Sequence, residues 1–485
     1  MLLTLFIVLY VICALLLTLH AVGQTILLIA YLKYRRQIPP LPSVNQWPTV
    51  VIQLPVYNEQ HVVRRLLDAV ARLDYPRECL EVQVLDDSVD ETTAILAAQV
   101  EALRRSGLNI HHIRREQRSG YKAGALAHGM TLTNSEFVVI LDADFIPPPD
   151  FLRRTIPYLV NDPQLGMVQT RWGHLNPFDN LLTRAQTLAV DGHFIVEQTA
   201  RNRAGLLMNF NGSGGVWRAA CIRESGGWSD ATLSEDLDLS YRAQLKGWRF
   251  LHVPDVVVPG ELPPQLAAYK QQQARWAKGS TQCLVLYLGP VWCAALTLAQ
   301  RLMATQHLCQ YMPHPLTMLL LLMTPLLLKA HGLQRLPLGL LSLAGLWPPL
   351  ISIISQQALY PDWKRRLLSF PALMLLGIGM TWNNTRAVIS GLVGEPNEFR
   401  RTPKFAQAWQ ASAYALRSDT GTWMELFMSC YTLWGLTIAF KVAPAFVPYL
   451  GLYALAFGWI ALWSLWERWQ VTRRPAAPSN VTAPL

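Results

Sequence analysis

Two carboxylates one residue apart, Asp142 and Asp144, carry the clearest chemical signal in the sequence. They follow the apolar run Val138–Leu141, which is typical of a short buried strand. Side chains two apart on a strand point to the same side, and open α/β sheets bind ligands at the carboxyl ends of their strands. Mg²⁺ and Mn²⁺ prefer such oxygen ligands and commonly join carboxylates to phosphates. An isolated pair is more often an ordinary acidic turn, so the surrounding chain has to decide.

Two more predicted strands end in polar residues. The run 50–54 precedes Tyr57 and Glu59, and the run 80–85 precedes Asp87. A basic loop, 114–122, ends in Lys122 and leads into a predicted helix of small residues. These pieces suit a nucleoside diphosphate with a metal ion, since a lysine or a helix N-terminus would lie near the phosphates. The sequence contains neither G-x-G-x-x-G nor G-x-x-x-x-G-K-[ST], which disfavours a dehydrogenase or a P-loop NTPase.

Three later stretches have both a chemical and a plain structural interpretation. A glycine-rich turn at 210–218 would let backbone approach a ligand at Gly212, with Trp217 free to stack on a sugar; the alternative is a simple tight turn. Ser234 resembles a helix N-cap, and acidic residues suit a first helical turn, so capping alone would explain Glu235 and Asp236. Arg275 and Trp276 also fit an amphipathic helix at a membrane surface.

The composition indicates a membrane protein with a globular part. Of 485 residues, 51% are hydrophobic and 15% charged, and long apolar runs fall in 2–31 and 312–466. The formal net charge is +10, and its basic clusters lie beside apolar runs, which favours anchoring at the cytoplasmic membrane surface over binding of nucleic acid. Seven cysteines without a CxxC pair indicate neither a zinc site nor a disulfide framework.

Strands alternating with helices from Thr49 onward predict an α/β domain with a mixed, mostly parallel sheet, inserted between transmembrane helices of an α-helical membrane part. We expect spans at 2–31, 316–328, 338–354, 424–440 and 446–466, with the N-terminus outside and the catalytic domain in the cytosol of a plasma or inner membrane. A sixth span at 363–393 would place basic residues 400–404 outside. The predicted division is a helix at 1–36, a catalytic domain at 37–280, interfacial helices at 281–311, two spans in 312–360, an interfacial helix and loop at 361–420, two spans in 421–468 and a tail at 469–485.

Taken together, these motifs resemble membrane-embedded family-2 glycosyltransferases with the GT-A fold, of the cellulose synthase and hyaluronan synthase type. In their amino-acid sequence the motifs resemble those of the cellulose-synthase-like glucomannan (mannan) synthases. The resemblance covers about residues 48–282 and rests on the order and spacing of several motifs: Tyr57-Asn58-Glu59, Val84-Leu85-Asp86-Asp87-Ser88, the run from Gly120 to Leu126, Asp142-Ala143-Asp144, Phe210-Asn211-Gly212, Gly215-Val216-Trp217-Arg218, Glu235-Asp236 and the Gln-Gln-x-Arg-Trp run at 272–276. Residues 399–404 resemble the family's gating motif F-x-V-T-x-K, with Arg401 in place of Val.

The resemblance implies a role for each matched residue. Asp236 would be the general base, with Glu235 beside it. The donor would be bound by Tyr57, Glu59, Asp87, Lys122, Asp142, Arg275 and Thr402. The acceptor would meet Trp276, Gly212 and Trp217. Mg²⁺ or Mn²⁺ would be held by Asp144 with Asp142.

We therefore expect an inverting, metal-dependent, processive β-glycosyltransferase that polymerises a hexose and translocates the polysaccharide. The donor would be UDP-glucose, GDP-mannose or GDP-glucose, and the partners a growing glycan or lipid acceptor and membrane lipids, with no nucleic acid. The alternative enzyme is a glycolipid synthase that transfers one or a few sugars to a membrane lipid. A non-enzymatic scaffold or transporter is disfavoured because Asp144, Asp236 and Trp276 are all present.

Overall fold

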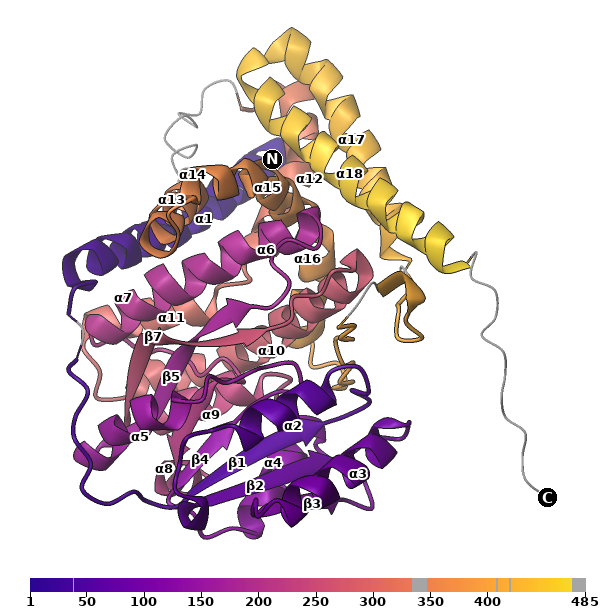
Figure 1. The fold of residues 1–485 in the computed structure, drawn as a ribbon. Coiled ribbons are helices and arrows are strands. Elements are labelled where there is room, and N and C mark those ends of the chain that lie inside the picture. The colour runs from indigo at the N-terminus through magenta and orange to yellow at the C-terminus, as the bar shows by residue number, and fades with distance from the viewer. Residues whose placement is uncertain (38, 334–346, 407–408, 418–419, 473–485) are drawn as a thin grey trace.

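A seven-stranded sheet with the order β3-β2-β1-β4-β6-β5-β7 forms the centre of the larger lobe (Figure 1). The computed structural model describes all residues except 38, 334–346, 407–408, 418–419 and 473–485. Strands β1 to β4 pair in parallel, β6 runs antiparallel to β4 and β5, and β7 pairs in parallel with β5. The predicted mixed, mostly parallel sheet is confirmed. The strands are β1 (Val50–Val56), β2 (Leu80–Asp86), β3 (Ile110–Arg114), β4 (Phe137–Ile140), β5 (Leu165–His174), β6 (Gly215–Arg218) and β7 (Arg249–Gly260).

Alternating side chains of the strands build one apolar core on each face of the sheet. Ile52 and Val139 pack with α2 (Val63–Ala71), α3 (Thr92–Arg105) and α5 (Phe151–Asn161). Val51 and Val138 face the other way, toward α4 (Tyr121–Thr131), α8 (Ala219–Glu224) and α9 (Glu235–Leu245). Because neighbouring residues on a strand point to opposite faces, the near-continuous apolar runs of β1 and β4 follow from burial on both sides.

The second half of the glycine-rich stretch 210–218 is a strand of the sheet, whereas the sequence predicts a turn. Gly215–Arg218 is strand β6, hydrogen-bonded between β4 and β5. Gly215 fits there because a Cβ would lie 2.5 Å from the Phe210 ring. This placement brings the turn at Gly212 to the same end of the sheet as Asp142.

A second group of helices lies between the sheet and the helices at the top of Figure 1. It consists of α6 (Leu181–Gly192), the π-helical turn η2 (His193–Gln198), α7 (Thr199–Arg203), α10 (Leu266–Cys293) and α11 (Leu298–Leu308). Beyond it lie α1 (Leu2–Tyr34), α12 (Pro313–Lys329), α13 (Trp347–Leu359), α14 (Trp363–Arg366), α15 (Phe370–Gly379), α16 (Thr381–Leu392), α17 (Gly421–Val442) and α18 (Val447–Thr472). Short 3₁₀ turns complete the chain: η1 (Arg77–Cys79), η4 (Leu367–Ser369), η5 (Trp409–Ala411) and η6 (Pro444–Phe446).

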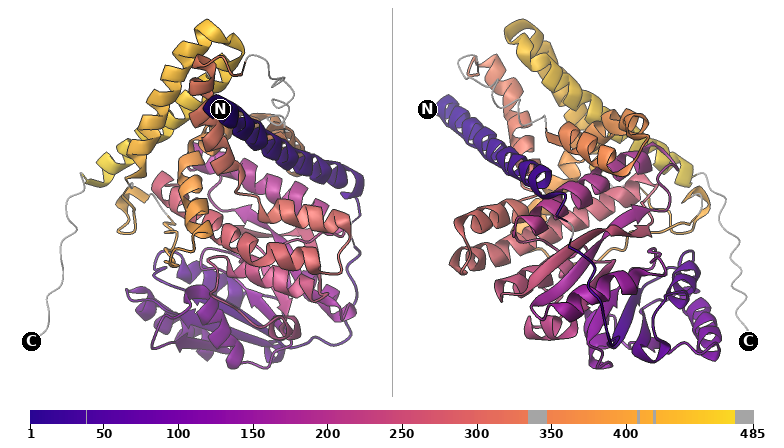
Figure 2. Two further views of the ribbon diagram at one scale, coloured as in Figure 1. Left: turned by 180° about the vertical axis from the view of Figure 1, so that it is seen from behind. Right: turned by 60° about the vertical axis from the view of Figure 1, so that its left-hand side comes forward.

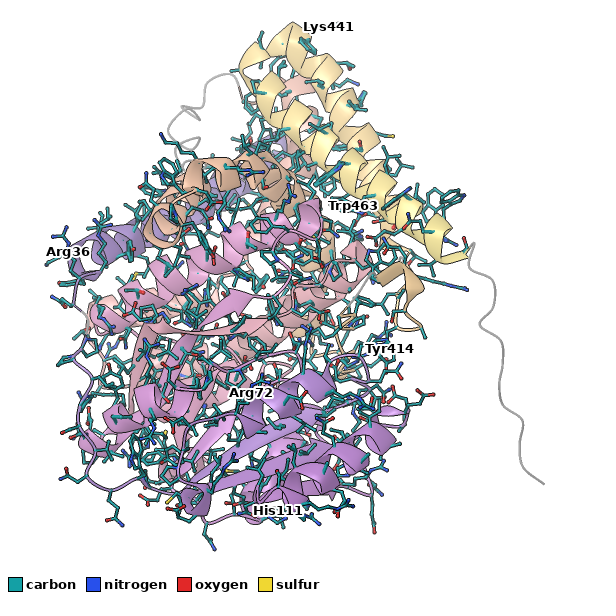
Figure 3. All side chains as sticks on the ribbon, in the orientation of Figure 1. Arg36, Arg72, His111, Tyr414, Lys441 and Trp463 are labelled. Carbon is teal, nitrogen blue, oxygen red and sulfur yellow. The ribbon has the colours of Figure 1, made fainter. Side chains whose placement is uncertain are left out.

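Two helices in the described part of the chain are long and apolar enough to cross a membrane, Leu3–Tyr34 and Pro444–Thr472. A third follows if α11 and α12, bent by 64°, form one broken span. In two further views, α1 and the α17–α18 pair project from the sheet-containing lobe (Figure 2). Lys441, at the tip of the α17–α18 pair, lies at the opposite end of the molecule from His111 on β3 (Figure 3). These features support a membrane protein.

The expected five spans and their orientation stay predictions. Helices α13 and α17 overlap two of the expected spans, but neither is among the described helices that are long and apolar enough to cross a membrane. The expected span at 338–354 lies partly outside the described residues, as does most of the tail at 469–485.

Candidate active site

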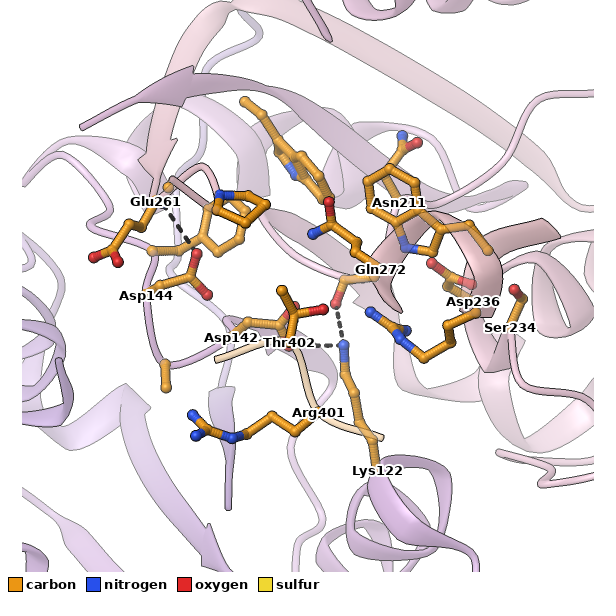
Figure 4. A pocket seen from close by; sticks show the side chains of 18 of the residues that line it. Lys122, Asp142, Asp144, Asn211, Ser234, Asp236, Glu261, Gln272, Arg401 and Thr402 are labelled. Carbon is orange, nitrogen blue, oxygen red and sulfur yellow. Dashed lines mark hydrogen bonds and ion pairs between the residues drawn. The ribbon is translucent and has the colours of Figure 1, made fainter. Parts of the chain in front are cut away.

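A cavity of about 370 Å³ opens at the carboxyl ends of β1, β2 and β4. It is lined by all of the predicted site residues except Trp217: Tyr57, Glu59, Asp87, Lys122, Asp142, Asp144, Gly212, Glu235, Asp236, Arg275, Trp276 and Thr402. Figure 4 shows several of them converging from the sheet, from α4 and α9, and from the segment at 401–402. The sheet, two helix starts and a distant loop therefore bring these side chains within reach of one ligand, while the role of each stays a prediction.

Lys122 is the central cation of the cavity. Its ammonium lies 2.7 Å from an Asp142 oxygen and 3.3 Å from a Glu235 oxygen, and it donates to the Gly212 carbonyl at 2.8 Å (Figure 4). Although burial opposes its charge, Asp142 and Glu235 raise the pKa of Lys122 above its usual value. It therefore stays protonated and can attract an anionic phosphate.

Asp236, in the first turn of α9, has the properties of a general base. Burial, with a contribution from neighbouring Glu235, raises the pKa of Asp236 to about 7, so its carboxyl gains and loses a proton near neutral pH. One of its oxygens accepts from the Leu237 backbone N–H at 2.8 Å, which orients the group. Ser234 precedes α9 as predicted, but its side chain makes no capping hydrogen bond.

Gly212 approaches Asp236 more closely than another residue could. Its φ is +82°, and a Cβ at this position would lie 3.0 Å from an Asp236 oxygen. An L side chain here would be strained and would also crowd the carboxylate. The predicted close backbone approach thus occurs beside Asp236, the predicted base.

The Asp142–Asp144 pair fits a hard divalent cation. Its carboxylates supply the oxygen donors that Mg²⁺ and Mn²⁺ prefer. In the structure the Asp144 carboxylate is paired with a lysine. The Lys404 ammonium lies 2.7 Å from one Asp144 oxygen, and the same oxygen accepts a hydrogen bond from the Glu261 backbone N–H at 3.0 Å. The described residues contain no group of three or more His, Cys, Asp or Glu side chains gathered for a metal, so substrate phosphate oxygens would complete the coordination.

Two arginines that the sequence did not single out surround the expected nucleoside end. The Arg118 guanidinium lies 3.4 Å from the centre of the Tyr57 ring, and Arg115 forms a paired contact with Asp87 at 2.5 and 3.0 Å. Both come from the basic loop 114–122. Its unusual density of arginines was the available signal, since Arg is suited to bidentate and stacking contacts.

Residues 399–404 lie over the cavity. Arg401, which replaces the usual Val, pairs with Glu59 at 2.8 Å, and burial raises the pKa of Glu59 to about 7 although Arg401 opposes the shift. Phe399 stacks on Tyr121 with ring centres 5.7 Å apart, and the Arg275 guanidinium lies 5.0 Å from its centre. The Thr402 hydroxyl is buried and has no hydrogen-bond partner among the described residues, so it can contact a ligand that enters.

The prediction that Trp217 stacks on the acceptor is wrong. The side chain has no exposed surface and packs among Phe210, Trp228 and Phe250 in the core below β6. Strand alternation explains the error, because Val216 and Trp217 point to opposite faces and neither points along the strand toward the cavity. Trp276, in contrast, lines the cavity on α10, as do Gln310 and Tyr311 from the connection between α11 and α12.

Residues 48–279 match the family described as Glycosyltransferase like family 2. This stretch is therefore similar to glycosyltransferase family 2 domains. It is 46% identical over 237 residues to a probable glucomannan 4-beta-mannosyltransferase 6 of Oryza sativa subsp. japonica, covering 48% of this chain and 41% of that protein. It is 45% identical over 240 residues to glucomannan 4-beta-mannosyltransferase 2 of Arabidopsis thaliana, covering 48% and 45%. The chain thus matches less than half the length of each relative.

A solved structure supports the same fold. Mannosyltransferase PcManGT from Pyrobaculum calidifontis, in complex with GDP-Man and Mn²⁺, superposes with a TM-score of 0.54 over 80% of this chain and all of that chain, at 22% identity. The domain therefore has the GT-A glycosyltransferase fold.

Proposed function

We propose that the protein is an inverting, metal-dependent, processive β-glycosyltransferase that extends a polysaccharide and moves it across a membrane. The observation that supports this proposal most strongly is that one cavity is lined by the Asp142–Asp144 pair, by Lys122, by Asp236 with its pKa of about 7, and by Trp276. A donor, a metal, a base and an acceptor platform are what one transfer step needs.

The proposed donor is a nucleotide-activated hexose, with GDP-mannose favoured over GDP-glucose and UDP-glucose. Support comes from the names of the plant relatives and from the GDP-Man bound to the Pyrobaculum mannosyltransferase. In this assignment Tyr57, Asp87 and Arg118 surround the nucleoside, while Lys122 and Arg275 face the diphosphate.

In the proposed reaction Asp236 takes a proton from the acceptor hydroxyl as that oxygen attacks the anomeric carbon. The diphosphate leaves from the opposite side, so an α-linked donor gives a β-linked product. Lys122 and Arg275 stabilise the charge that builds on the leaving group. A bound Mg²⁺ or Mn²⁺, held by Asp144 and Asp142, would neutralise part of the same charge.

Translocation is proposed from the position of the acceptor side of the cavity. Trp276 lies within α10, and Gln310 and Tyr311 belong to the connection between α11 and α12. The cavity is thus lined by the helices that lead toward the apolar part of the protein, where a growing chain would leave.

Product analysis tests the proposal. The full chain in nanodiscs would receive Mn²⁺ or Mg²⁺ and radiolabelled GDP-mannose, GDP-glucose or UDP-glucose, with Asp236→Asn as the inactive variant and the exposed Asp255→Asn as its matched control. We expect high-molecular-weight product that a linkage-specific β-glycanase digests, formed by the wild type and Asp255→Asn only. Label that extracts into organic solvent would instead identify a glycolipid synthase, and no incorporation from any donor would refute the transferase activity.

A further inference from the structure

A chain of side-chain amides along the cavity wall fixes the orientation of Asn211. Gln198 Nε2 donates to the backbone carbonyl of Asn209 at 2.9 Å, and the same nitrogen faces Asn209 Oδ1 at 3.2 Å. Asn209 Nδ2 therefore points the other way, where it donates to the Phe210 carbonyl at 3.0 Å and meets Asn211 Oδ1 at 3.1 Å. Because a donor must face an acceptor, the oxygen of the Asn211 amide is assigned by its neighbours.

His193 approaches the same oxygen from η2. Its Nε2 lies 2.9 Å from Asn211 Oδ1, and its Nδ1 lies 3.0 Å from a Glu197 carboxylate oxygen. The Asn211 oxygen and the Glu197 carboxylate both accept hydrogen bonds, so His193 can bridge them and hold the Asn211 amide from η2.

The Glu197 carboxylate is itself held in its charged form. Its other oxygen accepts from Arg201, a fully buried guanidinium, at 3.1 Å. Although burial opposes the charge, Arg201 and His193 hold the pKa of Glu197 below its usual value. His193 and Glu197 are four residues apart in the π-helical turn η2, a feature frequent at functional sites, and His193 lines the cavity.

These contacts leave the amide nitrogen of Asn211 available to a ligand. Its oxygen is engaged by Asn209 and His193, whereas among the described residues Nδ2 reaches only the Asn209 carbonyl, at 3.5 Å. Asn211 lines the cavity (Figure 4), and the next residue, Gly212, borders Asp236. A fixed N–H donor therefore stands beside the proposed base.

We propose that Asn211 donates this hydrogen bond to a hydroxyl of the acceptor sugar, and that His193 and Glu197 are positioning residues that keep its amide in this orientation. The inference rests on the proposed transferase function, which it extends to the acceptor side. The base must touch the acceptor hydroxyl that it deprotonates, so a donor group next to Asp236 meets a neighbouring position of the same sugar. A hydroxyl can accept that bond while it donates to a carboxylate.

The test measures how much of the donor's sugar is transferred to the acceptor and how much is lost to hydrolysis by water. The full chain in nanodiscs, with GDP-mannose and mannotetraose below saturation, would be assayed for label in extended oligosaccharide and for label released as free mannose. The variants are Asn211→Ala, His193→Leu and His193→Gln, whose amide nitrogen can replace Nε2 as the donor to Asn211. The matched control is His111→Leu, a histidine exposed on β3.

We expect Asn211→Ala and His193→Leu to lower the ratio of transfer to hydrolysis by about tenfold, the loss of one well-placed hydrogen bond, with a raised KM for mannotetraose. His193→Gln should recover most of this ratio, and His111→Leu should match the wild type. Equal losses of transfer and hydrolysis, or no rescue by His193→Gln, would overturn the acceptor assignment while leaving the transferase intact. Absence of transfer by the wild type would overturn the proposed function, and the inference with it.

Discussion

The titration of Asp236 gives the sharpest prediction for the chemistry. An ordinary aspartate has a pKa of about 3.9 and would stay ionised throughout the neutral range. With a pKa of about 7, only about one Asp236 in eleven is ionised at pH 6, and half are ionised at pH 7. A general base works only when it is unprotonated, so kcat/KM for the acceptor should fall about tenfold per pH unit below 7.

Glu235 offers a way to move this limb of the pH profile. It is the largest contributor after burial to the raised pKa of Asp236, so Glu235→Gln should make Asp236 more acidic. The acid limb should move to lower pH by on the order of one unit, equivalent to about 1.4 kcal/mol of repulsion removed. Because Glu235 also lies 3.3 Å from Lys122, the maximum rate is expected to fall, but the shift of the limb is independent of that loss.

The assay is initial-rate transfer from labelled donor between pH 5 and 9 at subsaturating acceptor, with buffers of constant ionic strength. The exposed Glu224→Gln on α8 is the matched control and should superimpose on the wild type. Two results would refute the reasoning: a wild-type limb near pH 4, which would mean that Asp236 is not the titrating base, or a Glu235→Gln limb that does not move.

Two further substitutions test the geometry of the cavity. Gly212→Ala should abolish most activity, because the φ of +82° strains an L residue and its Cβ would lie 3.0 Å from an Asp236 oxygen. Gly205→Ala is the control: with a φ of +66° and nothing within 4 Å, it should cost only about 1–2 kcal/mol of stability. Equal activities of the two variants, with an equal loss of Tm, would contradict the close approach. Lys404→Met removes the ammonium from Asp144 and should tighten binding of Mn²⁺ in the absence of donor, followed by electron paramagnetic resonance. The exposed Arg400→Met should leave that affinity unchanged, and weaker Mn²⁺ binding by Lys404→Met would contradict competition for the carboxylate.

The parts of the site that follow local rules could be predicted from the sequence. Apolar runs ending in Glu59, Asp87 and Asp142 had to be strands with acidic carboxyl ends, and parallel strands place those ends at one edge of a sheet. The α/β class and the membrane character followed from the same runs and from composition, whereas the GT-A fold was implied by the resemblance of the motifs to family-2 glycosyltransferases.

The parts that depend on distant pairing could not be predicted. Asp144 and Lys404 are 260 residues apart, and no local period indicates that they meet. Arg401 could be noted only as a departure from the family's Val; the structure shows that it pairs with Glu59. Trp217 was misassigned because a four-residue strand that begins with Gly215, directly after Gly212 and Gly214, has too little alternation to reveal its buried face.

The contacts between the sheet-containing domain and the C-terminal helices determine how cooperatively the protein unfolds. Within α10, the buried Lys270 ammonium lies 2.6 Å from Glu425 of α17, and Glu467 of α18 accepts from the backbone N–H groups that start the helix, at 2.8 and 3.2 Å. Breaking a buried pair by removing one partner costs about 3–5 kcal/mol, against a total stability of about 5–15 kcal/mol for a typical domain.

A fragment ending at residue 279 would leave Lys270, Asp144 and Glu59 without these partners at once. The stretch that matches the family is therefore a unit of sequence but not an autonomous unit of folding. Denaturant should unfold the sheet and the helices that follow it in one transition, and synthesis of the chain should leave the catalytic domain incomplete until α18 has emerged and capped α10.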